Sequence, residues 1–148
     1  MANVEVGQEA PDFALRDENN QEVTLSKLRG KPVVLVFYPL DFSPMCTNEM
    51  CAYRDDFSLF EEKGAQVYGI SRDSTWTHKA FKQQHNLSQS LLADKKGDVA
   101  KLYGCWLEAA GVAERLTVVI DAEGVVRYVE HNSPVQPRDQ KKAAAALG

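Results

Sequence analysis

The stretch VVLVFYPLDFSPMC, residues 33–46, decides the fold of this chain. Its first six residues are apolar without any alternation of polar side chains, which is typical of a strand covered on both faces in a largely parallel sheet. Pro39 ends this strand, and a hydroxyl residue followed by proline, here Ser43 and Pro44, is a common start of a helix. The stretch therefore predicts a central strand, a short loop and a helix that begins just before Cys46.

A single apolar stripe follows along the predicted helix. Its members recur at steps of four, three, four and three residues, the spacing of one face of an α-helix, and they are Cys46, Met50, Tyr53, Phe57 and Phe60. Lys63 and Gly64 are typical of a helix end. One continuous helix is therefore expected, with Cys46 at the start of its buried stripe.

The rest of the chain alternates short strands and helices. Residues 11–16 and 22–25 flank a polar turn and predict an N-terminal hairpin. Further strands are expected at 66–71, 91–93, 116–121 and 125–129, and further helices from Asp73 or Ser74 to about His85, at 97–103 and from Pro137 onward. No repeat, linker or break in composition interrupts this order, so a single α/β domain is expected to span residues 1–148.

Composition excludes several classes of function. The 17 basic and 21 acidic residues give a net charge of −4 and form no block of one sign, so neither a nucleic acid nor a membrane is expected as a partner. The first residues show no signal pattern, and no run approaches the roughly 18 apolar residues of a spanning helix. We therefore expect a cytoplasmic protein, in which any cysteine that has a role is expected to be reactive rather than part of a structural disulfide.

Cys46 is the candidate nucleophile. It lies within the first turn of the predicted helix, where unpaired backbone N–H groups and the helix dipole favour a thiolate. The thiolate is the form of cysteine that acts in nucleophilic attack. The competing interpretation is a buried core cysteine at the head of the apolar stripe.

The neighbours of Cys46 carry a family resemblance. Pro39, Ser43 and Cys46 have the spacing P-x3-S-x2-C between a buried strand and a helix, and this motif resembles the active-site signature of the peroxiredoxins. Three further segments add to the resemblance in the same order along the chain: APDF at 10–13, LYG at 102–104 and RLTVVID at 115–121. It implies a thioredoxin-like α/β fold with an N-terminal β-hairpin extension and a central mixed sheet flanked by helices. It also implies reduction of peroxides without haem, flavin or metal.

The resemblance further implies a role for individual side chains. Cys46 attacks one peroxide oxygen and becomes a sulfenic acid, while Ser43 hydrogen-bonds the sulfur and the peroxide. Arg115 supplies positive charge for the thiolate and the leaving oxygen, and Pro39 shields the site from water. Glu49 matches an acidic position that orients the arginine in several branches of the family. The alternatives are a helix cap for Ser43, a surface charge for Arg115 and a solvated helix face for Glu49.

Cys51 follows Cys46 with the spacing C-x4-C. This spacing resembles the Q-type, or bacterioferritin-comigratory, branch of the family, which implies that Cys51 resolves the sulfenic acid as an intramolecular disulfide. Five residues along a helix separate two Cα atoms by about 8.7 Å, which is beyond the limit of about 7 Å for a disulfide. The helix start must therefore unwind before that bond forms.

The second half of the chain resembles a different branch. Three segments there look more like the alkyl hydroperoxide reductase E-type peroxiredoxins: residues 77–79, 110–115 and 137–140. Members of that branch commonly lack a resolving cysteine, so Cys46 would act alone, an external thiol would resolve it, and Cys51 would be a bystander. The two branches also differ in assembly, which leaves a monomer and a weak homodimer both open.

The remaining cysteine and the histidines are assigned no chemistry. Cys105 occupies a position where an aliphatic residue would serve equally well, so we expect a small buried hydrophobe there. His78, His85 and His131 show no metal-ligand spacing with the cysteines. Neither a cofactor nor a metal is therefore expected.

The function expected from these residues is thiol-dependent reduction of hydrogen peroxide and organic hydroperoxides, with thioredoxin or a related dithiol as the recycling partner. A thiol-disulfide oxidoreductase is disfavoured, because enzymes of that kind usually carry C-x2-C at the helix start and residue 49 here is Glu. A redox sensor, in which oxidation of Cys46 alters the helix and the binding of a partner, is a further hypothesis.

Overall fold

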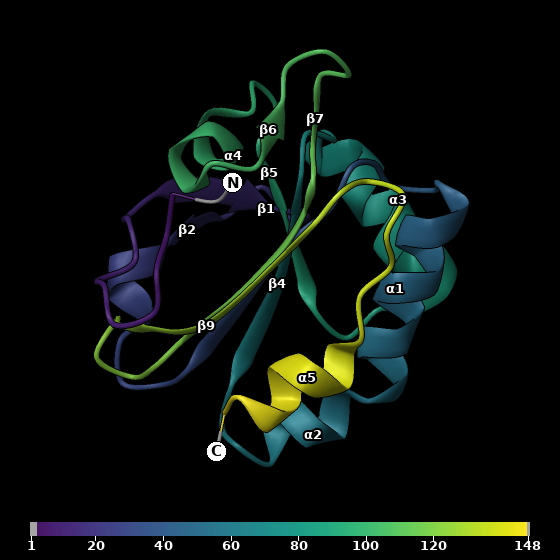
Figure 1. Ribbon diagram of the computed structural model, residues 1–148. Coiled ribbons are helices and arrows are strands. Elements are labelled where there is room, and N and C mark those ends of the chain that lie inside the picture. Colours follow the sequence, from purple (N-terminus) through teal and green to yellow (C-terminus); the bar gives the residue numbers. More distant parts are fainter. Residues whose placement is uncertain (1–2, 148) are drawn as a thin grey trace.

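The computed structural model describes residues 3–147 and is built around one mixed β-sheet (Figure 1). Within these residues seven strands hydrogen-bond in the order β2-β1-β5-β4-β3-β8-β9. Their bounds are β1 Ala14–Asp17, β2 Glu22–Thr24, β3 Val33–Phe37, β4 Gln66–Ser71, β5 Ser90–Ala93, β8 Arg115–Ile120 and β9 Val126–Asn132. A separate two-stranded sheet, which was not expected, joins β6 Trp106–Leu107 to β7 Val112–Ala113.

β3 is a central strand, as expected. It runs parallel to β4 and antiparallel to β8, with Leu35 opposite Tyr68 on one side and Val118 on the other. Among the strands of the described residues, only the pairs β3 with β4 and β4 with β5 are parallel, so the sheet is mixed rather than largely parallel. The antiparallel pairing places the start of β8 near the end of β3.

Both faces of the sheet are covered, which explains the uninterrupted apolar run of β3. Alternate side chains of a strand point to opposite faces. Val33, Leu35 and Phe37 belong to one buried cluster, and Val34 and Val36 belong to the other. Because each face has its own core, no polar alternation appears in the sequence of β3.

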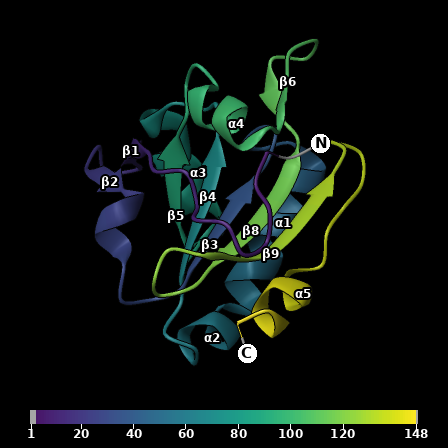
Figure 2. The same cartoon turned by 60° about the vertical axis from the view of Figure 1, so that its left-hand side comes forward.

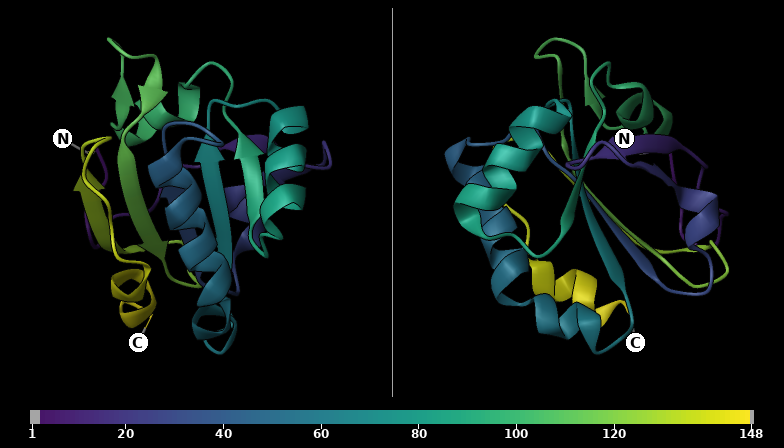
Figure 3. Two further views of the ribbon diagram at one scale, coloured as in Figure 1. Left: turned by 90° about the vertical axis from the view of Figure 1, so that its right-hand side faces the viewer. Right: turned by 180° about the vertical axis from the view of Figure 1, so that it is seen from behind.

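The helices divide between these two faces (Figures 2 and 3). The face of Val34 and Val36 is covered by α1 Pro44–Asp55, α2 Phe57–Glu61, α3 Thr75–His85 and α5 Gln140–Ala145. The opposite face carries the 3-10 helix η1 Leu25–Leu28 and α4 Asp98–Tyr103, and the N-terminal hairpin, whose strands form one edge of the sheet, packs against the same core. The expected α/β class, with an N-terminal hairpin and a mixed sheet flanked by helices, is confirmed. In the described part of the chain, no helix is long and apolar enough to cross a membrane.

The long helix expected after Ser43 is interrupted. α1 ends at Asp55 and α2 begins at Phe57, and between them Asp56 has φ −101° and ψ 18°. The Asp56 carboxylate accepts a hydrogen bond of 2.5 Å from the side chain of Gln140 at the start of α5. This long-range contact holds the chain at the break, and Phe57 is half-buried instead of continuing a fully buried stripe.

The last helix starts later than expected. α5 begins at Gln140 because Asp139 caps it, with the carboxylate accepting from the Lys141 N–H at 2.9 Å. Pro137 and Arg138 precede the helix and lie outside it. Arg138 is only 8% exposed. An arginine is rarely buried to this extent unless it is paired with a buried partner.

Candidate active site

Cys46 lies where the end of β3 and the start of α1 meet. β3 ends at Phe37, a loop of residues 38–43 follows, and Cys46 is in the first turn of α1. Its thiol is free, and the residue has no exposed surface. Pro39, in the loop, is buried as well. The candidate nucleophile is therefore enclosed in the reduced protein.

Arg115 contacts Cys46 although 69 residues separate them along the chain. β8 starts at Arg115 and runs antiparallel to β3, with Thr117 opposite Val36, so its first residue lies near the loop that follows β3. The guanidinium Nη1 is 3.3 Å from the Cys46 sulfur, and Nε donates to the Pro134 carbonyl oxygen at 2.9 Å. Arg115 is 2% exposed, so the interpretation as a surface charge is wrong.

Glu49 lies one helical turn beyond Cys46 on α1 and contacts the same arginine. Its Oε1 accepts a hydrogen bond from Arg115 Nη1 at 2.6 Å, and the two side chains are only 5% and 3% exposed. A buried carboxylate requires an opposite charge or several donors close by. The alternative of a solvated helix face is therefore wrong, and the carboxylate lies where it can orient Arg115.

A second arginine, Arg138, completes the buried ion cluster and was not predicted. Its backbone N–H donates to Glu49 Oε2 at 2.9 Å, and its Nη2 lies 3.2 Å from Oε1. The same guanidinium donates to the Thr117 hydroxyl at 3.1 Å and to the Phe37 carbonyl oxygen at 2.5 Å. Local sequence contains no signal for this burial, because the partners of Arg138 come from α1, β3 and β8.

The charged groups beside the Cys46 sulfur favour a negative charge at that position. Two guanidinium groups flank one carboxylate, and Arg115 Nη1 is shared between Glu49 and Cys46. A cationic N–H donor stabilises a thiolate more than a neutral thiol. Unpaired backbone N–H groups in the first turn of α1 act in the same direction. The site thus suits a thiolate nucleophile and an oxygen that departs as an anion.

Ser43 occupies the start of α1 without capping it through its side chain. Its backbone has φ −66° and ψ 145°, and its carbonyl oxygen accepts from the Thr47 N–H at 2.8 Å. The hydroxyl instead donates to the Leu40 carbonyl oxygen at 3.1 Å. Ser43 is thus the N-cap residue by its backbone, and its hydroxyl does not cap the helix. The hydroxyl oxygen keeps lone pairs that can accept from a hydroperoxide.

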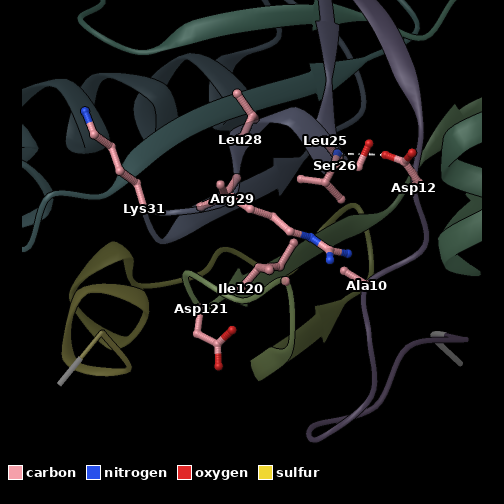
Figure 4. Close-up of a pocket in the computed structure, with 11 residues that line it drawn as sticks. Ala10, Asp12, Leu25, Ser26, Leu28, Arg29, Lys31, Ile120 and Asp121 are labelled. Atoms are coloured by element: carbon pink, nitrogen blue, oxygen red, sulfur yellow. Dashed lines mark hydrogen bonds between the residues drawn. The ribbon is translucent and has the colours of Figure 1, made fainter.

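The hollow drawn in Figure 4 does not belong to this site. It encloses about 20 Å³, the space of about one water molecule. Leu25, Val33 and Ile120 are among the residues that line it. Val33 is the first residue of β3, whereas Cys46 follows the other end of that strand.

Known proteins match the chain in sequence. A family model described as the AhpC/TSA family matches residues 6–129. The chloroplastic peroxiredoxin Q of Sedum lineare is 43% identical over 138 residues, which cover 93% of this chain and 74% of that protein. The chain belongs to the AhpC/TSA family of peroxiredoxins. The chloroplastic peroxiredoxin Q of Suaeda salsa is 44% identical over 138 residues, and the match covers 93% of this peroxiredoxin but only 64% of that relative.

Solved structures confirm the thioredoxin-like fold of this peroxiredoxin. Peroxidoxin BcpB from Mycobacterium tuberculosis has a TM-score of 0.89 at 34% identity, covering 98% of this chain and 97% of that one. The names of these relatives, peroxiredoxin Q and BcpB, agree with the Q-type resemblance of the C-x4-C spacing.

Cys46 and Cys51 both lie in regular helix, and both thiols are free. Cys51 is half-buried and packs against the core cluster that contains Cys46. The helix between them is tied to a neighbouring segment, because Gln89 Nε2 donates to the Met50 carbonyl oxygen at 3.0 Å. Gln89 is 1% exposed, and its Oε1 has no partner among the described residues. The segment that separates the two cysteines is thus held from outside the helix.

Cys105 lies in the core cluster on the opposite face of the sheet and is 1% exposed. Burial raises the pKa of its thiol far above the usual value. A thiol that stays protonated is a poor nucleophile. The expected role as a small buried hydrophobe fits this environment.

Proposed function

We propose that this peroxiredoxin is a thiol peroxidase that reduces hydrogen peroxide and organic hydroperoxides through Cys46. The observation that carries the proposal is the 3.3 Å contact between Arg115 Nη1 and the Cys46 sulfur, with Glu49 holding the same nitrogen at 2.6 Å. A free thiol beside a fixed guanidinium suits attack on a neutral oxidant whose leaving group is an anion.

The first step in this proposal is attack of the Cys46 thiolate on one peroxide oxygen. A sulfur–oxygen bond forms and the oxygen–oxygen bond breaks, so Cys46 becomes a sulfenic acid and the departing oxygen takes up a proton as an alcohol or water. Arg115 stabilises the negative charge on the departing oxygen. Ser43 hydrogen-bonds the peroxide, and Pro39 keeps water from the sulfur.

We further propose that Cys51 resolves the sulfenic acid. Its thiolate attacks the Cys46 sulfur, a disulfide forms, and the released hydroxide takes up a proton as water. The first turns of α1 open for this step, because a regular helix keeps the two Cα atoms about 8.7 Å apart. Thioredoxin or a related dithiol then reduces the disulfide by exchange and is itself oxidised. The half-buried position of Cys51 and the Q-type names of the relatives support this cycle.

A one-cysteine cycle is the second candidate. The hydrogen bond from Gln89 to the Met50 carbonyl favours it, because this bond holds α1 between the two cysteines and opposes unwinding. An external thiol would then attack the sulfenic acid of Cys46 directly, and Cys51 would stay a free thiol.

Mass spectrometry after one equivalent of hydrogen peroxide separates the two cycles. A crosslink between Cys46 and Cys51 supports the two-cysteine cycle. Sulfenic or sulfinic acid on Cys46 together with free Cys51 rules that cycle out and supports the external thiol.

Peroxide consumption with a thioredoxin system tests the peroxidase itself. Cys46→Ser removes the nucleophile, so we expect turnover to be lost, whereas Cys105→Ala should keep it because Cys105 is buried on the other face. Consumption by Cys46→Ser at the rate of the parent protein would refute the peroxidase and favour a redox sensor.

We propose that residues 1–148 act as one domain, in the cytoplasm, as a monomer or weak homodimer and without a cofactor. The plant relatives are named as chloroplastic, so the compartment needs a direct test by fractionation. Light scattering across a range of protein concentrations tests the assembly, and a stable large oligomer would contradict it.

A further inference from the structure

A second buried cluster lies beside the loop that follows β3. His78, from α3, and Asp41, from the loop, are joined at 2.6 Å between Nδ1 and Oδ2, and neither side chain has exposed surface. The Tyr38 hydroxyl donates to the other Asp41 oxygen at 2.5 Å. The peroxidase cycle described above uses none of these three groups. Because a buried ionisable pair is costly unless fully satisfied, its presence here needs a reason.

The hydrogen-bond partners determine how many protons the pair holds. His78 Nε2 lies 3.0 Å from the Leu92 carbonyl oxygen, which can only accept, so Nε2 carries a proton. A second proton lies between Nδ1 and the Asp41 carboxylate, because two lone pairs 2.6 Å apart would repel. Burial raises the pKa of the Asp41 carboxyl, and the bond from His78 opposes that rise. The pair is therefore neutral as a whole and shares one proton, which permits its complete burial.

Asp41 is also held by the end of β4 and the segment that follows it. Its backbone N–H donates to Asp73 Oδ2 at 2.8 Å, and the same oxygen accepts from the Ser71 hydroxyl at 2.5 Å. Asp41, Asp73 and His78 offer ligand atoms within 4.8 Å of one another, as a metal site would. Both carboxylate oxygens of Asp41 are already engaged by Tyr38 and His78, so hydrogen bonds close the cluster and we assign it no cation.

The loop that Asp41 anchors is strained and carries groups of the active site. Asp41 lies between Pro39 and Ser43, and the next residue, Phe42, has φ 69°, in a left-handed region that phenylalanine rarely adopts. The Phe42 ring packs edge-on against Phe81 of α3, with centroids 5.0 Å apart. A backbone conformation of this kind persists only where its surroundings hold it. Two anchors of the loop, His78 and Phe81, come from α3 and act beside the contact of Asp41 with Asp73.

We propose that His78 is a positioning residue for peroxide reduction, which holds Asp41 and with it the loop from Pro39 to Ser43 against Cys46. The inference rests on the proposed peroxidase function of this loop. With the loop held, Ser43 faces the peroxide and Pro39 keeps water from the sulfur. Without the bond to Asp41, the strained loop relaxes away from Cys46. Peroxide then reacts more slowly because its binding groups are displaced, whereas a larger alkylating reagent reaches the sulfur more easily.

His78→Gln separates this role from general stability. The glutamine amide can reach the Leu92 carbonyl oxygen in place of Nε2, but it cannot take the place of Nδ1 at Asp41. We expect the rate constant for hydrogen peroxide to fall about tenfold, and alkylation of Cys46 by iodoacetamide to become about threefold faster at the same pH. His78→Asn places an amide nitrogen where Nδ1 was, and should keep the peroxide rate within about threefold of the parent.

Val126→Ala controls for lost stability, because Val126 is buried in the core cluster on the opposite face of the sheet. Val126→Ala should lower the free energy of unfolding. It should not slow the reaction with peroxide while making alkylation of Cys46 faster. The proposal is overturned if His78→Gln moves both rates in the same direction or leaves both within about twofold of the parent. It is also overturned if His78→Asn is as slow with peroxide as His78→Gln.

Nitrogen-15 NMR of the parent protein tests the pair even if every His78 variant fails to fold. We expect a bound proton at Nε2 and a proton shared between Nδ1 and Asp41, and the absence of a proton from both sides of this contact at neutral pH would overturn the proposal. Alkylation needs no peroxidase activity. If the parent failed to reduce peroxide, the proposed function would fall, while the alkylation rates of parent and His78→Gln would still decide whether His78 holds the loop.

Discussion

Glu49 and Arg115 form a buried ion pair of 2.6 Å, and the arginine nitrogen that makes it also lies 3.3 Å from the Cys46 sulfur. One N–H-bearing nitrogen therefore links the carboxylate to the nucleophile. Whatever fixes the carboxylate also fixes the positive charge beside the sulfur.

Glu49→Gln keeps the shape of the side chain and removes its charge. Two buried guanidinium groups then lack their carboxylate, so we expect the free energy of unfolding to fall by about 3 kcal/mol. The peroxide rate constant should fall about tenfold or more, because Arg115 is no longer held at the sulfur. Urea unfolding and stopped-flow kinetics measure the two effects. Glu61→Gln, at an exposed position of α2, should change neither, and a fully active Glu49→Gln protein would contradict the assigned orientation of Arg115.

Arg138→Lys tests the second arginine. A single ammonium group cannot contact Glu49, Thr117 and the Phe37 carbonyl together, so about 1–3 kcal/mol of unfolding free energy should be lost. Arg127→Lys is the matched control, because the Arg127 side chain is 54% exposed in its pair with Asp121. That exposed pair should contribute less than about 1 kcal/mol. Equal losses of unfolding free energy in the two variants would show that the buried contacts of Arg138 stabilise the fold no more than an exposed ion pair does.

Cys105 should resist alkylation in the folded protein. Its burial raises the pKa of the thiol and shields it from reagents, so the reactive thiolate is scarcer than at an exposed cysteine. Treatment with iodoacetamide at pH 8, followed by peptide mass spectrometry, should find Cys105 unmodified until denaturant is added. Labelling of Cys105 in the native protein at the rate of half-buried Cys51 would contradict the burial described here.

Gln89→Met should ease the opening of α1. The substitution removes the bond to the Met50 carbonyl, worth about 1 kcal/mol, and also removes a buried Oε1 that lacks a partner among the described residues. We therefore expect little change in stability but about fivefold faster formation of the Cys46–Cys51 disulfide. Acid quenching and mass spectrometry after peroxide addition measure the rate. Ser88→Ala, at the exposed neighbouring position, is the control, and an unchanged crosslinking rate would show that Gln89 does not restrain the helix.

Patterns among residues close together in the sequence correctly predicted those strands and helices that are determined by local residues. A strand is expected at 66–71 and β4 forms at Gln66–Ser71. Ser74 is one of the two expected caps of α3, and its hydroxyl oxygen accepts from the Thr77 N–H at 3.2 Å. In both cases the physical cause, a run of apolar side chains or a hydroxyl at a helix start, lies within a few residues.

Contacts between segments that are distant in the sequence could not be predicted, because no local sequence pattern indicates them. His78 is buried against Asp41, 37 residues away, and Arg138 reaches Glu49 across 89 residues. Without the folded sheet, His78 is an ordinary polar residue of a helix and Arg138 is an ordinary polar residue of a loop. Nothing in the sequence around either residue indicates that it is buried. Resemblance to a family located Arg115, whereas Arg138 became evident only when β3, β8 and α1 were brought together.

The two arginines and one carboxylate at the sulfur have a consequence for the second half of the catalytic cycle. With a thiolate on Cys46, these four charges cancel. A sulfenic acid is neutral, so each peroxide reduced leaves one positive charge uncompensated in a buried site. In a Cys51→Ser protein, reduction of the sulfenic acid by small thiols should then be faster for an anionic thiol than for a neutral one, and the difference should shrink as salt is added. Oxidation thus converts a site balanced for an uncharged substrate into one that attracts the anion needed to restore it.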